Sequence, residues 1–324
     1  MAESTQWAFP AKLQPDARKV AFDLDAVQNA VVKLRADVPD DAFTASTLGT
    51  DRGGNGVVID ERGLVLTIGY LITEAETVWL TTNDGTTLAG HPLAYDFATG
   101  FGLVQPLGRL PAAPLARGSV ADLAVDDDVY VIGHGGRTHA LKAHVIARRE
   151  FAGYWEYMLD DALFTAPPHP EWSGAALVDE TGKLVGIGSL LVQESVGDDV
   201  VQGNMFVPID LLPALLADVQ KFGRSTQPPR PWLGMYTTEI ADHVVVHGLA
   251  KNAPADSAGV RLGDIVVDVG GDKVAGLADL YRKIWRCGAP GASIPLTLAR
   301  DSAIVRVQVR SADRADYLRK PLLQ

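Results

Sequence analysis

The chain has 324 residues, of which 47% are hydrophobic and 21% charged, and its formal net charge at pH 7 is −11. This length is enough for about two domains, and the acidic balance argues against nucleic acid or an anionic membrane as a main partner, because both select for lysine and arginine patches. The single cysteine, Cys287, excludes an intrachain disulfide and a cysteine-rich metal site.

The N-terminal arm, residues 1–19, has no clear helical or strand pattern, and Trp7 and Phe9 are isolated aromatic residues in it. It lacks a basic segment followed by an apolar run, so a secretory signal is not expected. The sequence contains no run of 18 apolar residues, so a membrane-spanning helix is not expected either. These features favour a cytoplasmic protein; a periplasmic or extracytoplasmic location stays open if the chain is a processed form.

Residues 20–222 form the first predicted domain. Residues 26–34 fit either a strand or a short helix. Short β-like runs then follow at regular spacing, which is typical of an all-β barrel or sandwich, and Asn83-Asp84-Gly85 indicates a hairpin turn. The runs are 56–60, 64–72, 77–82, 127–133, 142–150, 176–189 and 203–209.

A helix and a linker end this domain. Apolar residues recur at helical spacing through residues 209–222, and Gly223 suits the end of a helix. Residues 223–231 contain three prolines, so we expect a stiff spacer and place the domain boundary there.

The second predicted domain is residues 232–312, and a C-terminal tail, residues 313–324, follows it. Residues 277–287 are predicted to form a helix with one apolar face, and two strands follow at 293–300 and 303–309. Cys287, at the end of the helix, is expected to be a small core residue.

Residues 252–274, NAPADSAGVRLGDIVVDVGGDKV, resemble the signature of PDZ domains, with several glycines and one aspartate at fixed offsets. The resemblance implies a groove in which a peptide C-terminus adds a strand to a sheet edge while loop amides bind its carboxylate. The helix over residues 277–287 would form the second wall of this groove. The alternative is that the apolar face of this helix is simply part of the domain's core. The groove residues that the resemblance implies are Trp232, Leu233, Gly234 and Met235 in the loop, with Leu280 and Ile284 on the helix.

The first domain resembles the trypsin-like domain of HtrA/Deg serine proteases. The residues GGNGVVIDERGLVLT (53–67) and HPEWSGAALVDETGKLVGI (169–187) carry the resemblance. Further matching stretches, 83–96, 126–134 and 205–209, come in the family's order. The resemblance implies a mostly β protein, a trypsin-like double β-barrel of two six-stranded barrels followed by an α+β PDZ domain with a small sheet and two helices.

The resemblance also implies the positions of the catalytic residues. Ser173 occupies the nucleophile position, but Tyr70 replaces the histidine base and Gly100 replaces the aspartate. Glu171 replaces a glycine of the oxyanion hole. A phenol with a pKa near 10 is a poor base at neutral pH, so a chain with these three replacements is expected to retain no useful triad chemistry.

No other histidine is expected to replace the missing catalytic base. His169 lies four residues before Ser173 and is expected to be a loop histidine. His134, His139 and His144 recur every five residues, which is not a metal-site pattern, and we expect them on the surface or in strand turns. No metal and no cofactor is expected.

Three functions stay open. The leading hypothesis is an HtrA-like protein without protease activity that binds peptide C-termini or unfolded segments through its PDZ groove. The alternative is an active serine endopeptidase that uses Ser173 with a non-standard base. The third is a structural assembly subunit, and the resemblance implies a homotrimer in which Trp7 and Phe9 would take part.

Overall fold

The computed structural model describes residues 7–196 and 199–319. Residues 1–6 of the expected arm and 320–324 of the expected tail lie outside this range. The chain forms two compact units. The first unit is Met1–Arg149, Asp161–Ser225 and Arg319–Gln324, and the second is Glu150–Asp160 and Thr226–Leu318.

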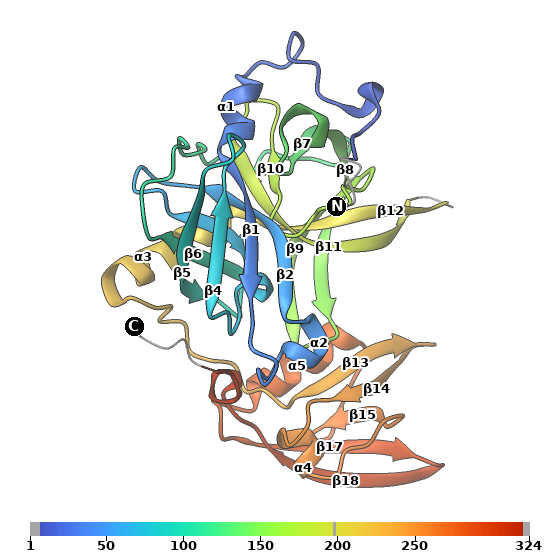
Figure 1. Cartoon of the computed structure of the whole chain (residues 1–324). Coiled ribbons are helices and arrows are strands. Elements are labelled where there is room, and N and C mark those ends of the chain that lie inside the picture. The colour runs from blue at the N-terminus through green and yellow to red at the C-terminus, as the bar shows by residue number, and fades with distance from the viewer. Residues whose placement is uncertain (1–6, 197–198, 320–324) are drawn as a thin grey trace. The chain divides into compact units, whose positions relative to one another are not determined.

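Two closed six-stranded β-barrels form the first unit, as the family resemblance implied (Figure 1). The strand order is β1-β2-β3-β6-β5-β4 in the first barrel and β10-β11-β12-β9-β8-β7 in the second. The first barrel consists of β1 (Val31–Asp37), β2 (Asp51–Val58), β3 (Val65–Ile68), β4 (Thr77–Thr81), β5 (Thr87–Tyr95) and β6 (Phe101–Pro106). The second consists of β7 (Asp128–Ile132), β8 (Ala140–Gly153), β9 (Tyr157–Ala166), β10 (Ala176–Val178), β11 (Leu184–Val196) and β12 (Asp199–Pro208).

Strand β1 illustrates how the sequence builds a barrel. Leu34 and Ala36 are buried, whereas Lys33 and Arg35, which alternate with them, are exposed, and this is the two-residue period of a strand with one face in a core. Because β1 pairs with both β2 and β4, the barrel closes and leaves no open sheet edge. Residues 26–34 hold both predicted alternatives, since the short helix α1 (Leu24–Asn29) leads directly into β1.

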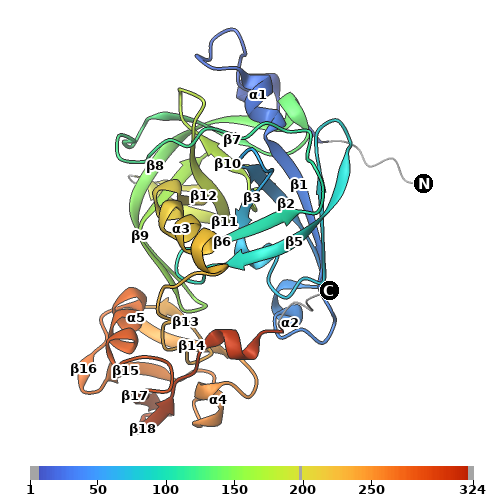
Figure 2. The same ribbon diagram turned by 90° about the vertical axis from the view of Figure 1, so that its left-hand side faces the viewer.

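The helix predicted over residues 209–222 is confirmed. A 3₁₀ turn, η4 (Ile209–Leu211), continues into α3 (Leu212–Phe222), and Gly223 ends it with the left-handed φ of 71° that glycine adopts without strain. Figures 1 and 2 both show α3 beside strand β6. In the described part of the chain, no helix is long and apolar enough to cross a membrane. The remaining helical turns are η1 (Ala11–Leu13), α2 (Ala45–Leu48), η2 (Gly69–Leu71), η3 (Gly136–His139) and η5 (Arg314–Tyr317).

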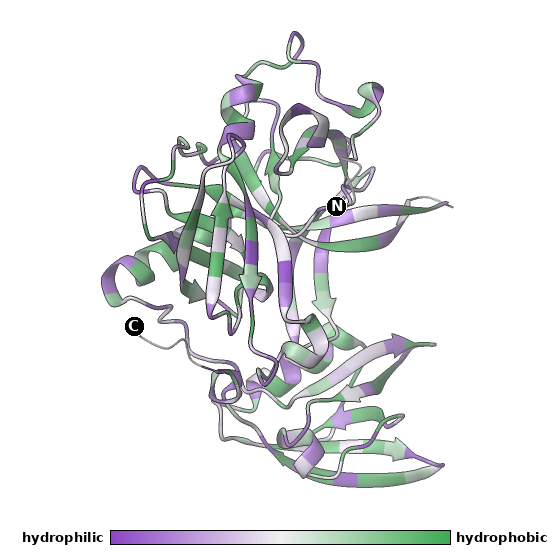
Figure 3. Ribbon diagram, in the orientation of Figure 1, coloured by the Kyte–Doolittle hydropathy of each residue, from purple (hydrophilic) through white to green (hydrophobic). Residues whose placement is uncertain are grey.

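The second unit is built on a sheet with the order β13-β14-β15-β17-β18, with β16 paired to β15, so that β13 is an edge strand. Apolar residues alternate with polar ones along much of β18, and Figure 3 shows the sheet's strands banded by hydropathy. Helix α5 (Leu277–Arg286) buries the predicted apolar face in the core of this unit. The other elements are β13 (Met235–Ile240), β14 (His243–Leu249), α4 (Pro254–Ser257), β15 (Ile265–Val269), β16 (Asp272–Lys273), β17 (Ser293–Arg300) and β18 (Ala303–Arg310).

The expected core position of Cys287 is wrong. Helix α5 ends at Arg286, so Cys287 lies beyond the buried stripe and is exposed, with its Sγ 3.3 Å from the carbonyl oxygen of Lys283.

The second unit also contains residues 150–160, which the sequence analysis assigned to the first domain. They are the turn between β8 and β9 with the adjoining strand ends. Met158 joins Leu233 and Leu280 in the hydrophobic core of this unit, so the unit is not limited to residues 232–312.

Asp264 ties the turn before β15 to β17. Its fully buried carboxylate accepts hydrogen bonds from the Arg300 guanidinium at 2.6 and 2.7 Å and from the Arg261 amide at 2.8 Å. Burial alone would raise the pKa of Asp264, but the hydrogen bonds from Arg300 and the Arg261 amide outweigh it, and the pKa is lowered.

We predict that Asp264→Asn lowers the free energy of unfolding at pH 7 by about 3 kcal/mol, because the Arg300 guanidinium loses a buried partner. Denaturant unfolding measures this. Since the folded-state pKa lies below the ordinary 3.8, the carboxylate contributes fully above that pH. The difference between the two proteins should therefore shrink as the pH falls below about 4. The exposed Asp272→Asn is the control, and a loss below about 1 kcal/mol for Asp264→Asn would contradict this role.

Candidate active site and peptide-binding groove

The loop between β9 and β10 carries Ser173, and β2 holds it in place. The Asn55 amide donates to the Ser173 carbonyl at 2.7 Å, and Asn55 Nδ2 donates to the Glu171 carbonyl at 2.8 Å. A Cβ on Gly54 would lie 2.6 Å from the Ser173 carbonyl oxygen, so this close approach requires glycine. Sequence analysis did not single out Asn55; the local signal for it is its place among glycines at the point where β2 becomes buried.

Tyr70 lies next to Ser173. Its Oη is 2.7 Å from Ser173 Oγ and 2.8 Å from the carbonyl oxygen of Ser189. A carbonyl only accepts, so when Tyr70 donates to Ser189 it accepts the hydroxyl hydrogen of Ser173. Burial raises the pKa of Tyr70 to about 12. The two hydroxyls therefore form a neutral hydrogen-bonded pair at physiological pH.

Gly100 lies in the turn that leads into β6. Its φ is +83°, its amide donates to the Asp96 carbonyl at 2.7 Å, and its own carbonyl accepts from the Gly69 amide at 2.7 Å. The carboxylate of Asp96 is engaged within the same turn, where it accepts from the Thr99 hydroxyl at 2.7 Å. Gly100 thus contributes backbone pairing at this position and no charge.

The amide of Glu171 donates to Nδ1 of His169 at 3.0 Å. An oxyanion hole needs amide donors that are free to face the reacting carbonyl, and this one is already paired. The backbone of Glu171 does not have a positive φ. Its carboxylate accepts a hydrogen bond from the Trp7 indole at 3.0 Å, so it is held at the N-terminal arm.

His169 lies in the loop between β9 and β10, as expected, and is fully buried there. Its Nε2 is 2.8 Å from the His139 carbonyl, which only accepts, and its Nδ1 accepts from the Glu171 amide. The ring is therefore the neutral tautomer with its hydrogen on Nε2, and burial lowers the pKa of His169. Both ring nitrogens are engaged away from Ser173.

The N-terminal arm covers these histidines. Trp7 lies edge-on to His139, with ring centroids 4.4 Å apart, and Phe9 packs against His169 at 5.1 Å. His139 is consequently buried, although it lies in the turn between β7 and β8, one of its two expected places, whereas His144 on β8 is exposed. Among residues 7–196 and 199–319, no group of three or more potential ligand side chains is arranged to hold a metal ion.

A carboxylate already lies on the predicted PDZ loop. The Leu233 amide donates to Glu156 Oε1 and Oε2 at 3.1 and 3.0 Å, and the Met235 amide donates to Oε1 at 3.0 Å. Two residues further on, the Thr237 amide donates to the Tyr154 carbonyl at 3.1 Å. Met235 and Thr237 lie two residues apart on β13, so their amides point the same way, and the Leu233 amide meets the same carboxylate as the Met235 amide. The turn between β8 and β9 thus pairs with all three amides.

The position of Glu156 is unfavourable both for its backbone conformation and for the charge of its carboxylate. Its φ of 59° is in the left-handed region, which costs a residue other than glycine about 1–2 kcal/mol. Burial raises the pKa of Glu156 to about 7, although the amides of Met235 and Leu233 and the charge of Arg314 act to lower it. Sequence analysis missed Glu156, since the surrounding GYWEY matches no motif.

The other predicted groove residues are enclosed. Leu280 and Ile284 are fully buried in the core cluster that includes Met158. Trp232 is buried, and Gly234 has a φ of +71° with no room for a Cβ, which would meet Ala253 at 2.4 Å. The helix face is therefore covered in this structure.

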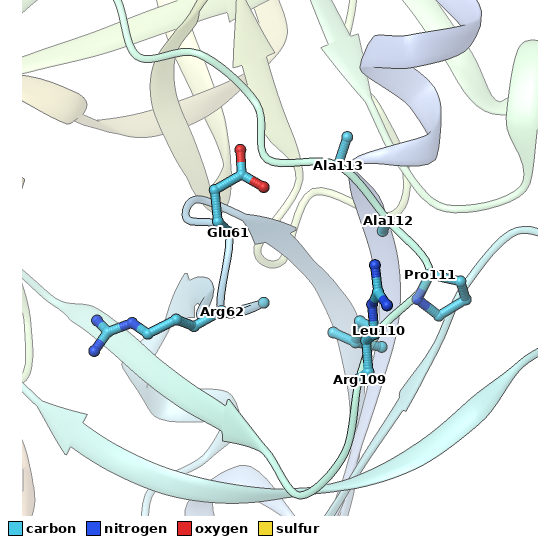
Figure 4. Close-up of a pocket in the computed structure, with 8 residues that line it drawn as sticks. Glu61, Arg62, Arg109, Leu110, Pro111, Ala112 and Ala113 are labelled. Carbon is cyan, nitrogen blue, oxygen red and sulfur yellow. The ribbon is translucent and has the colours of Figure 1, made fainter.

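A separate open cavity of about 320 Å³ lies on the first barrel. Figure 4 shows Glu61 and Arg62 on one side of it and residues 109–113 on the other. The Arg62 guanidinium is paired with Asp60 at 3.0 Å. None of the predicted site residues lines this cavity.

We predict that Tyr70→Phe lowers the free energy of unfolding by about 1–2 kcal/mol, because the Ser189 carbonyl loses its donor and Ser173 its partner. The folded-state pKa of Tyr70, about 12, exceeds the ordinary 10. The phenol's contribution is therefore complete below pH 10 and is lost as the pH rises toward 12. Denaturant unfolding at pH 8 and 11 should show the gap closing, with Tyr154→Phe, at an exposed residue, as control. An unchanged gap would contradict the neutral hydrogen-bonded pair.

Two domain families match this sequence. The trypsin-like peptidase domain matches residues 54–187, and the PDZ domain matches residues 231–310. Protease Do-like 1, chloroplastic, of Arabidopsis thaliana is 29% identical over 306 residues, which cover 86% of this chain and 68% of that protein. Serine endoprotease DegS of Escherichia coli is 24% identical over 277 residues, covering 79% and 75%.

Solved structures show the same fold. HtrA-type protease AlgW with a decapeptide is 20% identical, covers 92% of this chain and 98% of its own, and has a TM-score of 0.51. A serine endoprotease from Yersinia pestis is also 20% identical, with coverage of 91% and 99% and a TM-score of 0.51. The chain thus consists of a trypsin-like domain followed by a C-terminal PDZ domain, and it is similar in sequence to the Do-like and DegS proteases and in fold to HtrA-type proteases.

Proposed function

We propose that this chain is a proteolytically inactive HtrA-type protein that binds the C-termini of peptides through its PDZ groove. The observation that carries the binding function is the carboxylate of Glu156 on the amides of Leu233 and Met235. A peptide's terminal carboxylate has the same chemistry, and β13 offers the edge strand for the peptide backbone.

Three features support the loss of protease activity. Tyr70, the hydrogen-bond partner of Ser173, has a pKa of about 12 and is ionised in only about one molecule in 10⁵ at pH 7. Gly100 has no side chain to orient a base. The Glu171 amide is paired with His169.

The magnitudes favour inactivity. Loss of the triad histidine costs a serine protease on the order of 10⁶ in turnover, and loss of one oxyanion donor costs roughly a further 10²–10³. An active endopeptidase that uses Ser173 with Tyr70 as its base is the competing function. The Tyr70–Ser173 hydrogen bond would serve it, but the raised pKa of the phenol opposes it.

Ser173 should not react with a fluorophosphonate probe, and unfolded casein should not be cleaved, because no base of suitable pKa takes the hydroxyl proton. Intact-mass spectrometry after incubation with the probe measures the labelling. Stoichiometric labelling that disappears in Ser173→Ala would contradict inactivity. The single change Tyr70→His is not expected to create activity, so the informative gain-of-function variant combines Tyr70→His, Gly100→Asp and Glu171→Gly.

Peptides with a free C-terminus and an apolar last residue should bind with a Kd on the order of micromolar, about −8 kcal/mol. A pool of fluorescein-labelled decapeptides ending in valine, leucine or phenylalanine serves as the probe, and fluorescence anisotropy gives the affinity. The matching C-terminal amides should bind at least ten-fold more weakly, because the loop amides lose a charged acceptor. Equal binding of acids and amides would contradict the groove assignment.

A further inference from the structure

The turn between β8 and β9 makes the contacts that a bound peptide would make. Its carboxylate, from Glu156, lies on the loop amides, and its backbone carbonyl at Tyr154 accepts from the edge strand at Thr237. Residues 153–157 thus pair with the same donors that the proposed ligand needs.

We propose that residues 153–157 are an internal ligand of the PDZ groove, with the Glu156 carboxylate in the place of a peptide's terminal carboxylate, and that a peptide C-terminus binds only after this turn has left. The proposal rests on the function proposed above and adds to it a competitor within the chain.

Both walls of the groove hold the turn. On α5, the Tyr281 hydroxyl donates to the Gly153 carbonyl at 2.7 Å and lies 3.2 Å from the Glu156 amide, which donates to it. Arg282, the next residue on α5, pairs with Glu150 before the turn and, at 3.4 Å, with Asp160 after it. The backbone of β13 supplies the opposite wall.

The residue that follows the turn, Met158, packs in the hydrophobic core of the second unit. Met158 is 7% exposed and belongs to the cluster that contains Leu280 and Ile284, the two helix residues expected in the side-chain pocket. Both are fully buried in its presence. One continuous segment of the chain therefore contributes both to the contacts with the carboxylate loop and to the core cluster that holds these helix residues.

The residue at the tip is informative in itself. A turn that needs a φ of 59° is usually built with glycine or asparagine. Glutamate at this position is conformationally unfavourable, and an observed strain of this kind points to a role for the side chain. Here that role is the pairing with the loop amides.

Competition follows because one set of amides cannot serve two carboxylates. The apparent affinity for a peptide falls by the fraction of molecules in which the groove is free. If the turn is docked in about ten molecules for each one in which it is free, peptide affinity is about ten-fold weaker than the groove would otherwise give. Removal of the Glu156 carboxylate should therefore raise the peptide affinity about ten-fold.

The competition should depend on pH. Docking raises the pKa of Glu156 from the ordinary 4.5 to about 7, so docking takes up a proton between these values and is favoured as the pH falls. Peptide affinity should therefore rise from pH 5.5 to pH 8. The groups that face the turn are Arg314, Tyr281 and His247, whose ring lies 5.3 Å from that of Tyr154. Any pH dependence that survives in Glu156→Gln belongs to such groups.

The test compares the full chain with Glu156→Gly, which removes the carboxylate and suits the left-handed turn. Asp161→Asn is the matched control: it also removes one negative charge, from an exposed pair with Arg148 outside residues 153–157. Anisotropy with the labelled decapeptide pool at pH 7 should show at least ten-fold tighter binding to Glu156→Gly. The control should bind within two-fold of the wild-type chain.

Amide hydrogen exchange, read by NMR, provides a second measurement without peptide. In the wild-type chain the amides of Leu233, Met235 and Thr237 should exchange slowly. In Glu156→Gly they should exchange at least ten-fold faster, while the Val246 amide, bonded to the Asp264 carbonyl inside the unit, stays unchanged.

The outcomes separate the two proposals. Equal peptide affinity of the wild-type chain and Glu156→Gly, or rapid exchange of the three amides in the wild-type chain, overturns the internal ligand and leaves peptide binding standing. Absence of binding to both chains overturns the proposed function, and the competition falls with it.

Discussion

The need to pair buried backbone amides determines both candidate sites of this chain. An amide that is buried without an acceptor costs about as much as several favourable contacts provide. In the Ser173 loop, the Glu171 amide finds its acceptor in His169, and in the PDZ loop the amides of Leu233 and Met235 find theirs in Glu156. An oxyanion hole and a peptide-binding groove instead need amides whose hydrogens are available to a bound substrate or peptide.

The same principle explains the hydroxyl pair. Ser173 in a protease is one end of a proton-transfer chain, whereas here its hydroxyl donates to Tyr70, and the Tyr70 hydroxyl donates in turn to the Ser189 carbonyl. A neutral phenol suits a buried position where an imidazolium and its carboxylate would have to be desolvated together. With Tyr70 at this position, the three groups form a hydrogen-bonded chain that joins the two barrels.

Much of the fold was predictable from local pattern. The two-residue alternation in β1, the helical spacing ended by Gly223 and the glycine-rich signature at 252–274 each depend on neighbours in the sequence. The positions of Tyr70 and Ser173 followed from a family resemblance, and their Oη and Oγ atoms lie within hydrogen-bond distance.

The remaining features depend on contacts between distant residues. Glu156 and Leu233 are 77 positions apart, and no periodicity in GYWEY predicts that a carboxylate there would meet a loop amide. His139 is buried because Trp7 lies on it, and Cys287 is exposed because α5 ends one residue earlier than the predicted helix. Such features need the three-dimensional arrangement.

The central claim is that the chain's own carboxylate occupies the amides of the PDZ loop, and an NMR titration of the Glu156 carboxyl carbon tests it most directly. In the full chain the titration should have its midpoint near pH 7 and return toward the ordinary 4.5 when a C-terminal peptide is added, because the peptide displaces the turn. A midpoint near 4.5 that peptide does not change would contradict the account.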